Sequence, residues 1–67
     1  MSIVKVIEVI ASSEKSFDDA IQNAVNEVSK TVKNIDSVYV ENMKCHVHAG
    51  KISSYGVNCK VSFRVES

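Results

Sequence analysis

The densest group of residues able to bind a metal ion is the run from Cys45 to His48. In an extended strand, His46 and His48 share one face with side chains ~7 Å apart, whereas Cys45 points to the other face. Two imidazoles can hold one ion when a carboxylate or a second copy of the chain completes the ligand set. No second close pair of this kind occurs in the sequence. The run therefore indicates either a metal site shared between copies or two exposed polar residues near a turn.

Basic and acidic side chains are dispersed along the chain, and they balance to a formal net charge of zero. The basic residues of interest are Lys44, Lys60 and Arg64, and the acidic ones are Glu8, Glu41 and Glu66. The basic set could bind a phosphate, and the acidic set could gather a hard cation at a symmetry axis. We interpret both sets as ion pairs between subunits, because isolated basic residues in a neutral chain carry little signal for an anion site.

Several functional classes find no support in the composition. Zero net charge offers no footprint for nucleic acid and no polybasic patch for a membrane surface. With two glycines there is no glycine-rich phosphate loop, and no motif places a serine or cysteine nucleophile beside a base. No segment approaches the roughly 20 apolar residues of a membrane span. The sequence therefore predicts a cytoplasmic protein that is not an enzyme.

One segment, Ser16–Ile35, has the pattern of an amphipathic helix, with apolar residues every three or four positions and wettable residues opposite. Ser16 is expected to cap the start by accepting a hydrogen bond from the backbone N–H of Asp19. Lys30 and Lys33 suit the negative end of the helix dipole. The apolar stripe consists of Phe17, Ala20, Ile21, Ala24, Val25, Val28, Val32 and Ile35.

Three other segments have the composition of strands. They are residues 2–11, about Ser37–His48 and about Ile52–Val65, with a turn at Ala49-Gly50 between the last two. Residues 2–11 leave neither face polar, which predicts burial on both sides. The third strand alternates most regularly. Its apolar face is expected to carry Tyr55, Val57, Cys59, Val61, Phe63 and Val65.

The predicted hairpin also bears on the two cysteines. The parity of apolar residues changes between Val40 and Met43, which indicates a β-bulge. A tight turn would place Cys45 opposite roughly Ser54, and Cys59 opposite roughly Val40. The two thiols would then lie beyond the ~7 Å Cα separation that a disulfide tolerates. Free cysteines suit a reducing compartment, and Cys59 is expected to be inert core.

The elements predict an α+β fold of one domain, residues 1–67, in the order β-α-β-β. A three-stranded antiparallel sheet should wrap around one helix. A helix of ~18 residues spans ~27 Å, whereas a strand of ~13 residues extends to ~43 Å. The strands therefore overreach the helix, and a chain of 67 residues has a marginal core by itself. Both observations predict an oligomer.

Over nearly its whole length the sequence resembles the dodecins, which are small flavin-binding proteins. The resemblance rests on the order and spacing of V-K-V-I-E-V-I, S-F-x-x-A-x-x-x-A-V, S-K-T-V-x-N-I, V-E-N after Tyr39, and K-V-S-F-R-V-E. It implies a β-α-β-β protomer, twelve copies of which form a hollow shell of tetrahedral symmetry. It also implies a binding or storage role, with FMN or riboflavin as ligand.

In flavin-binding dodecins, pairs of isoalloxazine rings stack between tryptophans, and a glutamine on the last strand contacts the polar edge of the flavin. This chain has Ser37 in place of the tryptophan and Gly56 in place of the glutamine. Tyr39 could supply an aromatic surface instead. The resemblance thus implies a ligand site at or near Ser37, Tyr39, Lys44 and Gly56. The alternative is a homologue that does not bind flavin and binds a metal ion or another ligand, or acts as a scaffold.

Overall fold

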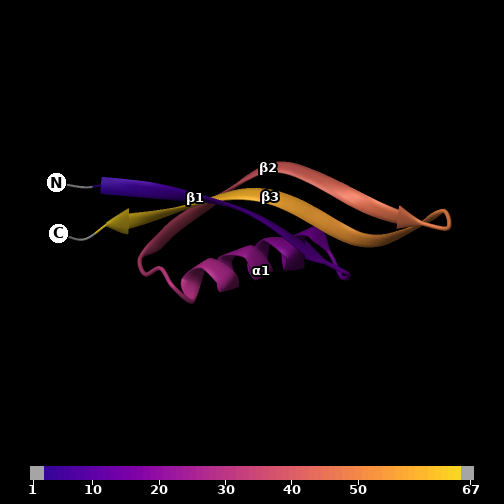
Figure 1. Cartoon of the computed structure of the whole chain (residues 1–67), viewed down its shortest axis with the longest axis horizontal. Coiled ribbons are helices and arrows are strands. Elements are labelled where there is room, and N and C mark those ends of the chain that lie inside the picture. Colours follow the sequence, from indigo (N-terminus) through magenta and orange to yellow (C-terminus); the bar gives the residue numbers. More distant parts are fainter. Residues whose placement is uncertain (1–2, 66–67) are drawn as a thin grey trace.

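One helix packs on one face of a three-stranded antiparallel sheet, which confirms the predicted β-α-β-β fold (Figure 1). The computed structural model describes residues 3–65. The elements are β1 (Ile3–Ser13), α1 (Phe17–Ser29), β2 (Ile35–His48) and β3 (Lys51–Val65). The sheet order is β1-β3-β2, so the last strand of the chain lies at the centre. No helix of this part of the chain is long and apolar enough to cross a membrane.

The turn at Ala49-Gly50 joins β2 to β3 as expected. Both residues have positive φ, 51° at Ala49 and 77° at Gly50. Two successive residues with positive φ are typical of the hairpin turns whose twist matches that of the flanking strands. The β2–β3 hairpin extends well past the N-terminal end of α1 (Figure 1). It gives the chain a longest dimension of 52 Å.

The pairing of β2 with β3 contains the predicted bulge. Val40 lies opposite Cys59 and Asn42 lies opposite Asn58, which leaves Glu41 as the extra residue. A second irregularity near the turn shifts the register once more. Cys45 consequently lies opposite Tyr55 and not opposite Ser54, a correction of one residue. Both cysteines are free.

The core is formed where the small residues of α1 meet β3. Ala20 and Ala24 have almost no exposed surface, and they pack against Val57 and Cys59. Alanine lets the helix approach the sheet closely, because it has no side chain beyond Cβ. Burial raises the pKa of the Cys59 thiol. A raised pKa leaves little thiolate, which supports the expectation that this cysteine is inert.

The start of α1 is held by three side chains. The Ser16 hydroxyl accepts a hydrogen bond from the Asp19 N–H at 3.0 Å, as predicted. The Asp19 carboxylate in turn accepts from the buried Ser13 hydroxyl at 2.7 Å, which ties the helix to the end of β1. Phe17, the first residue of α1, and Tyr55 of β3 form an edge-to-face aromatic pair with ring centroids 5.1 Å apart.

The end of α1 differs from the prediction. The helix stops at Ser29 and does not continue to Ile35, which instead begins β2. Between the helix and β2, Asn34 adopts a positive φ of 63°, a conformation that asparagine tolerates better than most residues and that a continuing α-helix does not contain. Lys30 is therefore the C-cap and Lys33 lies beyond the helix, so the last turn contains no basic residue.

Only one face of β1 is covered within the chain. Val9 and Ala11 pack toward α1. Val4, Val6 and Ile10 on the opposite face are exposed, Ile10 by 73%. The predicted burial on both sides therefore needs a second copy or a ligand.

We expect Val28→Asp to abolish folding. Val28 is buried in the helix stripe, and an unpaired charge there costs several kcal/mol, a large fraction of the ~5–15 kcal/mol that stabilises a domain. Circular dichroism during urea titration measures the loss. Gln22→Asp on the exposed face of the same helix is the matched control. A cooperative transition for Val28→Asp close to that of the parent would show that the helix face is assigned wrongly.

Candidate functional site

The sheet face opposite α1, called the outer face, carries rows of side chains that cross all three strands. Strand register places one residue of each strand in each row. The rows are Val6, Ser62 and Ser37; Glu8, Lys60 and Tyr39; Ile10, Asn58 and Asn42; and Ser12, Gly56 and Lys44. Because side chains alternate along a strand, the members of these rows share one face.

The four residues predicted for the ligand site all lie on this outer face, but in two separate depressions. Hollow A has a volume of about 240 Å³ and hollow B about 270 Å³. Hollow A is lined by Ile10, Asn42, Lys44, Gly56, Val57 and Asn58. Hollow B is lined by Val6, Ser37, Tyr39, Lys60 and Ser62. The structure thus brings Ser37 together with Tyr39, and Lys44 together with Gly56.

Hollow B has a pair of hydroxyl groups at the position where flavin-binding dodecins have a tryptophan. The Ser37 and Ser62 hydroxyls lie 2.5 Å apart, and the Ser62 hydroxyl also donates to the Ser37 carbonyl at 3.3 Å. Tyr39 is 72% exposed on the same face. Its ring is therefore the aromatic surface in hollow B that a planar ligand can reach.

Lys60 on β3 lines hollow B, and its row lies next to the Asn58 row of hollow A. Its ammonium group contacts the Glu41 carboxylate at 2.7 Å. The hydrogen bond and charge of Glu41, with a smaller effect from Glu8, raise the pKa of Lys60. The predicted pairing of Lys60 with an acid is thus present, but it lies within one chain.

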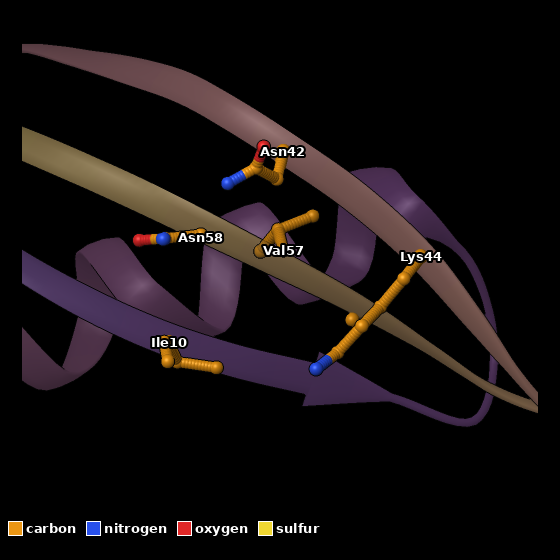
Figure 2. A pocket seen from close by; sticks show the side chains of 6 residues that line it. Ile10, Asn42, Lys44, Val57 and Asn58 are labelled. Carbon is orange, nitrogen blue, oxygen red and sulfur yellow. The ribbon is translucent and has the colours of Figure 1, made fainter.

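Hollow A is shaped by Lys44, whose side chain crosses β3 at Gly56 (Figure 2). A Cβ added at Gly56 would lie 3.3 Å from Lys44 Cγ and 3.4 Å from its Cε. The aliphatic part of Lys44 therefore occupies the space in which a side chain at position 56 would project. The Lys44 side chain, which comes from the neighbouring strand β2, thus fills the space at the position where the glutamine is missing.

Three residues of hollow A were not singled out from the sequence. Ile10 provides an apolar wall, and Asn42 and Asn58 provide carboxamides. The Asn58 Oδ1 atom is buried and accepts no hydrogen bond within the described part of the chain. Asparagine is depleted in strands. The presence of one asparagine in each of two neighbouring strands was therefore the signal that could have revealed this site.

The candidate metal ligands lie elsewhere. His46 and His48 are exposed near the hairpin tip, opposite Ser54 and Lys51, and away from both hollows. Among residues 3–65, no group of three or more His, Cys, Asp or Glu could hold a metal ion. Glu66, one of the acids considered for a cation, lies outside the described residues.

The three basic residues also remain dispersed. Lys44 and Lys60 belong to different rows, and Arg64 lies opposite Val4 toward the other end of β3. They do not form an anion site within one chain.

Gly56→Ala and Gly50→Ala form a matched pair. We expect Gly56→Ala to raise the unfolding free energy by up to about 1 kcal/mol, because glycine weakens a strand relative to alanine and the Lys44 side chain can shift. Gly50→Ala should lower it by about 1 kcal/mol or more, because Gly50 has φ +77°. Thermal unfolding compares the two. Destabilisation by Gly56→Ala would mean that Lys44 is held rigidly over position 56.

Comparison with known proteins gives one consistent family. The family model named Dodecin matches residues 3–66. A dodecin of Thermus thermophilus is 28% identical over 64 residues, covering 96% of this chain and 93% of that protein.

Solved structures agree with the sequence comparison. The tt0972 protein of Thermus thermophilus superposes with a TM-score of 0.94 at 27% identity, covering 100% of this chain and 98% of that one. A dodecin of Streptomyces davaonensis gives 0.91 at 29% identity, with coverage of 98% and 97%. A calcium-chelating antigen of Mycobacterium tuberculosis, described as a calcium dodecin with a novel calcium-binding site, gives 0.81 at 31% identity, with coverage of 96% and 91%.

Proposed function

Because the chain belongs to the dodecin family, we propose that it is a non-enzymatic protein that binds and stores a small ligand of the flavin class on its outer face. The observation that carries this proposal is the gathering of Ser37, Tyr39, Lys44 and Gly56 into two hollows of one sheet face. We further propose that residues 1–67 act as one domain in the cytoplasm, where the two free cysteines stay reduced.

The residues of the outer face fit a flavin, although they differ from the tryptophan and glutamine of flavin-binding dodecins. A bound flavin would supply a planar ring system that absorbs light and accepts electrons. The Tyr39 ring would stack on such a ring, and an aromatic pair contributes ~0.5–1.5 kcal/mol beyond its buried area. Val6 and Ile10 offer apolar contact beside it. Lys44 carries an ammonium group that would attract the phosphate of FMN.

We propose that the protein works as a homododecameric shell. Support comes from apolar side chains that one chain leaves exposed on β1 and on the projecting hairpin. These are Ile3, Val4, Val6, Ile10, Met43, Val47 and Ile52. The close superposition on dodecins supports the same assembly, because the elements that would meet in it are all present.

A cation is the alternative ligand. The calcium dodecin of Mycobacterium tuberculosis favours this alternative. Since residues 3–65 hold no complete ligand group, a cation site in this chain would draw ligands from several copies. The His46 and His48 imidazoles suit zinc or another transition metal, whereas calcium requires oxygen ligands.

Fluorescence titration with riboflavin and FMN tests the flavin proposal. We expect the parent protein to quench both flavins, Tyr39→Ala to bind more weakly, and the double variant Ser37→Trp/Gly56→Gln to bind about tenfold or more tightly, because it restores a stacking surface and an amide. Ser29→Trp, at the exposed end of α1, controls for quenching by an added indole. A parent that is purified colourless and quenches neither flavin contradicts the proposal.

Native mass spectrometry tests the assembly and the bound ion together. We expect the mass of twelve 7.4 kDa chains at micromolar concentration. A monomer or dimer would contradict the shell. Any retained metal should disappear in His46→Ala/His48→Ala if the imidazoles hold it, and should persist there if carboxylates do.

A further inference from the structure

The part of the outer face nearest the β2–β3 turn carries both histidines of the chain. His46 lies opposite Ser54, and His48 lies opposite Lys51. These two rows continue the outer face beyond the row of Lys44, because side chains alternate along each strand. Both histidines are exposed. The hairpin tip thus presents two imidazoles to the same side of the sheet.

A bulge in β3 keeps the two imidazoles on one face. Val47 lies opposite Ile52, so the extra residue of this irregularity is Ser53 of β3, and β2 stays regular through His48. The Ser53 hydroxyl donates to the His46 carbonyl at 3.2 Å, which ties the bulged residue to β2. The two histidines are therefore ~7 Å apart along a regular strand. A pair placed on a strand is held more precisely than a pair on a loop.

Two imidazoles at this spacing can converge on one ion, to which zinc–nitrogen bonds measure ~2.0–2.1 Å. Imidazole suits zinc, copper and nickel, whereas calcium and magnesium prefer oxygen. The pair supplies half of a tetrahedral ligand set. Cys45, the nearest thiol, lies opposite Tyr55 and points to the helix side of the sheet. Residues 3–65 contain no group of three or more ligands that would complete the set.

The helix side of the same tip indicates where the missing ligands come from. Val47 and Ile52 are paired there and are exposed by 64% and 56%. Neighbouring apolar side chains at the end of a projecting hairpin suit contact with another copy of the chain. Contact between two tips would bring two imidazole pairs together. Lys51 opposes the binding of a cation, because its ammonium group lies on the same face as the histidines.

We propose that His46 and His48 chelate a transition-metal ion of the zinc class, and that the same pair from a second copy completes a site of four imidazoles between two hairpin tips. This inference rests on the cation alternative of the proposed function, and it names the ligands, the class of metal and the partner. It does not depend on flavin binding, because both hollows lie away from the tip.

Zinc affinity tests the ligands. The assembled protein is stripped with EDTA, dialysed and titrated with zinc chloride in competition with a zinc-binding dye. His46→Ala and His48→Ala should each bind zinc about tenfold or more weakly than the parent, because each removes one of two ligands per chain. Cys45→Ala is the matched control and should bind like the parent. Lys51→Gln should bind about two- to threefold more tightly, because it removes a repelling charge. Equal affinity of the parent and both histidine variants would overturn the site.

An added ligand tests the position of the ion. Ser54→His places a third imidazole opposite His46 and should tighten zinc binding about tenfold, whereas Ile52→His places one on the helix side and should not. No gain from Ser54→His would show that the ion lies elsewhere.

Native mass spectrometry of the zinc-loaded assembly tests the shared site. One zinc ion per two chains supports it, and one ion per chain would show that each pair binds its own ion without a partner. A parent that binds no zinc would overturn the inference and leave the flavin proposal intact, because the riboflavin titration is repeated on the metal-free protein. If zinc binds as expected and riboflavin does not, the flavin proposal fails and the imidazole site stands.

Discussion

A helix of 13 residues packs on strands of up to 15 residues, and this mismatch in length governs the rest of the molecule. The helix is about 20 Å long, whereas the folded chain measures 52 Å along its longest axis. Ala20, Ala24 and Val28 bury the middle of the sheet and leave the hairpin tip and the whole outer face without cover. The protomer can fold around its helix, but its remaining apolar surface is available only for contacts with other molecules.

The outer face combines this apolar surface with a regular arrangement of polar groups. Antiparallel pairing aligns residues from three strands into rows, so groups distant in sequence become neighbours without any loop to position them. Lys60, paired with Glu41, separates the hydroxyl pair of hollow B from the carboxamides of hollow A. A binding surface built on strands in this way is held more rigidly than one built on loops.

Local patterns in the sequence predicted most of the fold, since periodicity reports which face is buried. The stripe through Val28, the bulge between Val40 and Met43 and the turn at Ala49-Gly50 were all expected. The helix end was missed because Val32 and Ile35 continue the helical spacing, although the helix stops at Ser29 and Asn34 has a positive φ that no continuing helix would contain. The candidate site was predicted only in part, because the members of a row are set by strand register.

Lys44 illustrates this limit. Its position over Gly56 depends on the register irregularity between His46 and Val47, which the apolar pattern did not reveal. The carboxamides of hollow A were missed for a related reason. An unpartnered acceptor is a property of the space around an atom, and the residue type alone does not reveal it.

The bulge at Glu41 has a consequence for how this surface can change. Before the bulge the outer face uses the odd positions Ser37 and Tyr39, and after it the even positions Asn42 and Lys44. Deleting Glu41 would remove the bulge and leave both pairs in regular alternation on the outer face, whereas deleting Met43 would put Asn42 and Lys44 on opposite faces. The bulge is therefore the one place between these two pairs where β2 can lose a residue and keep both hollows. Substitutions can alter the chemistry of either hollow separately, but a change of length between Asn42 and Lys44 cannot.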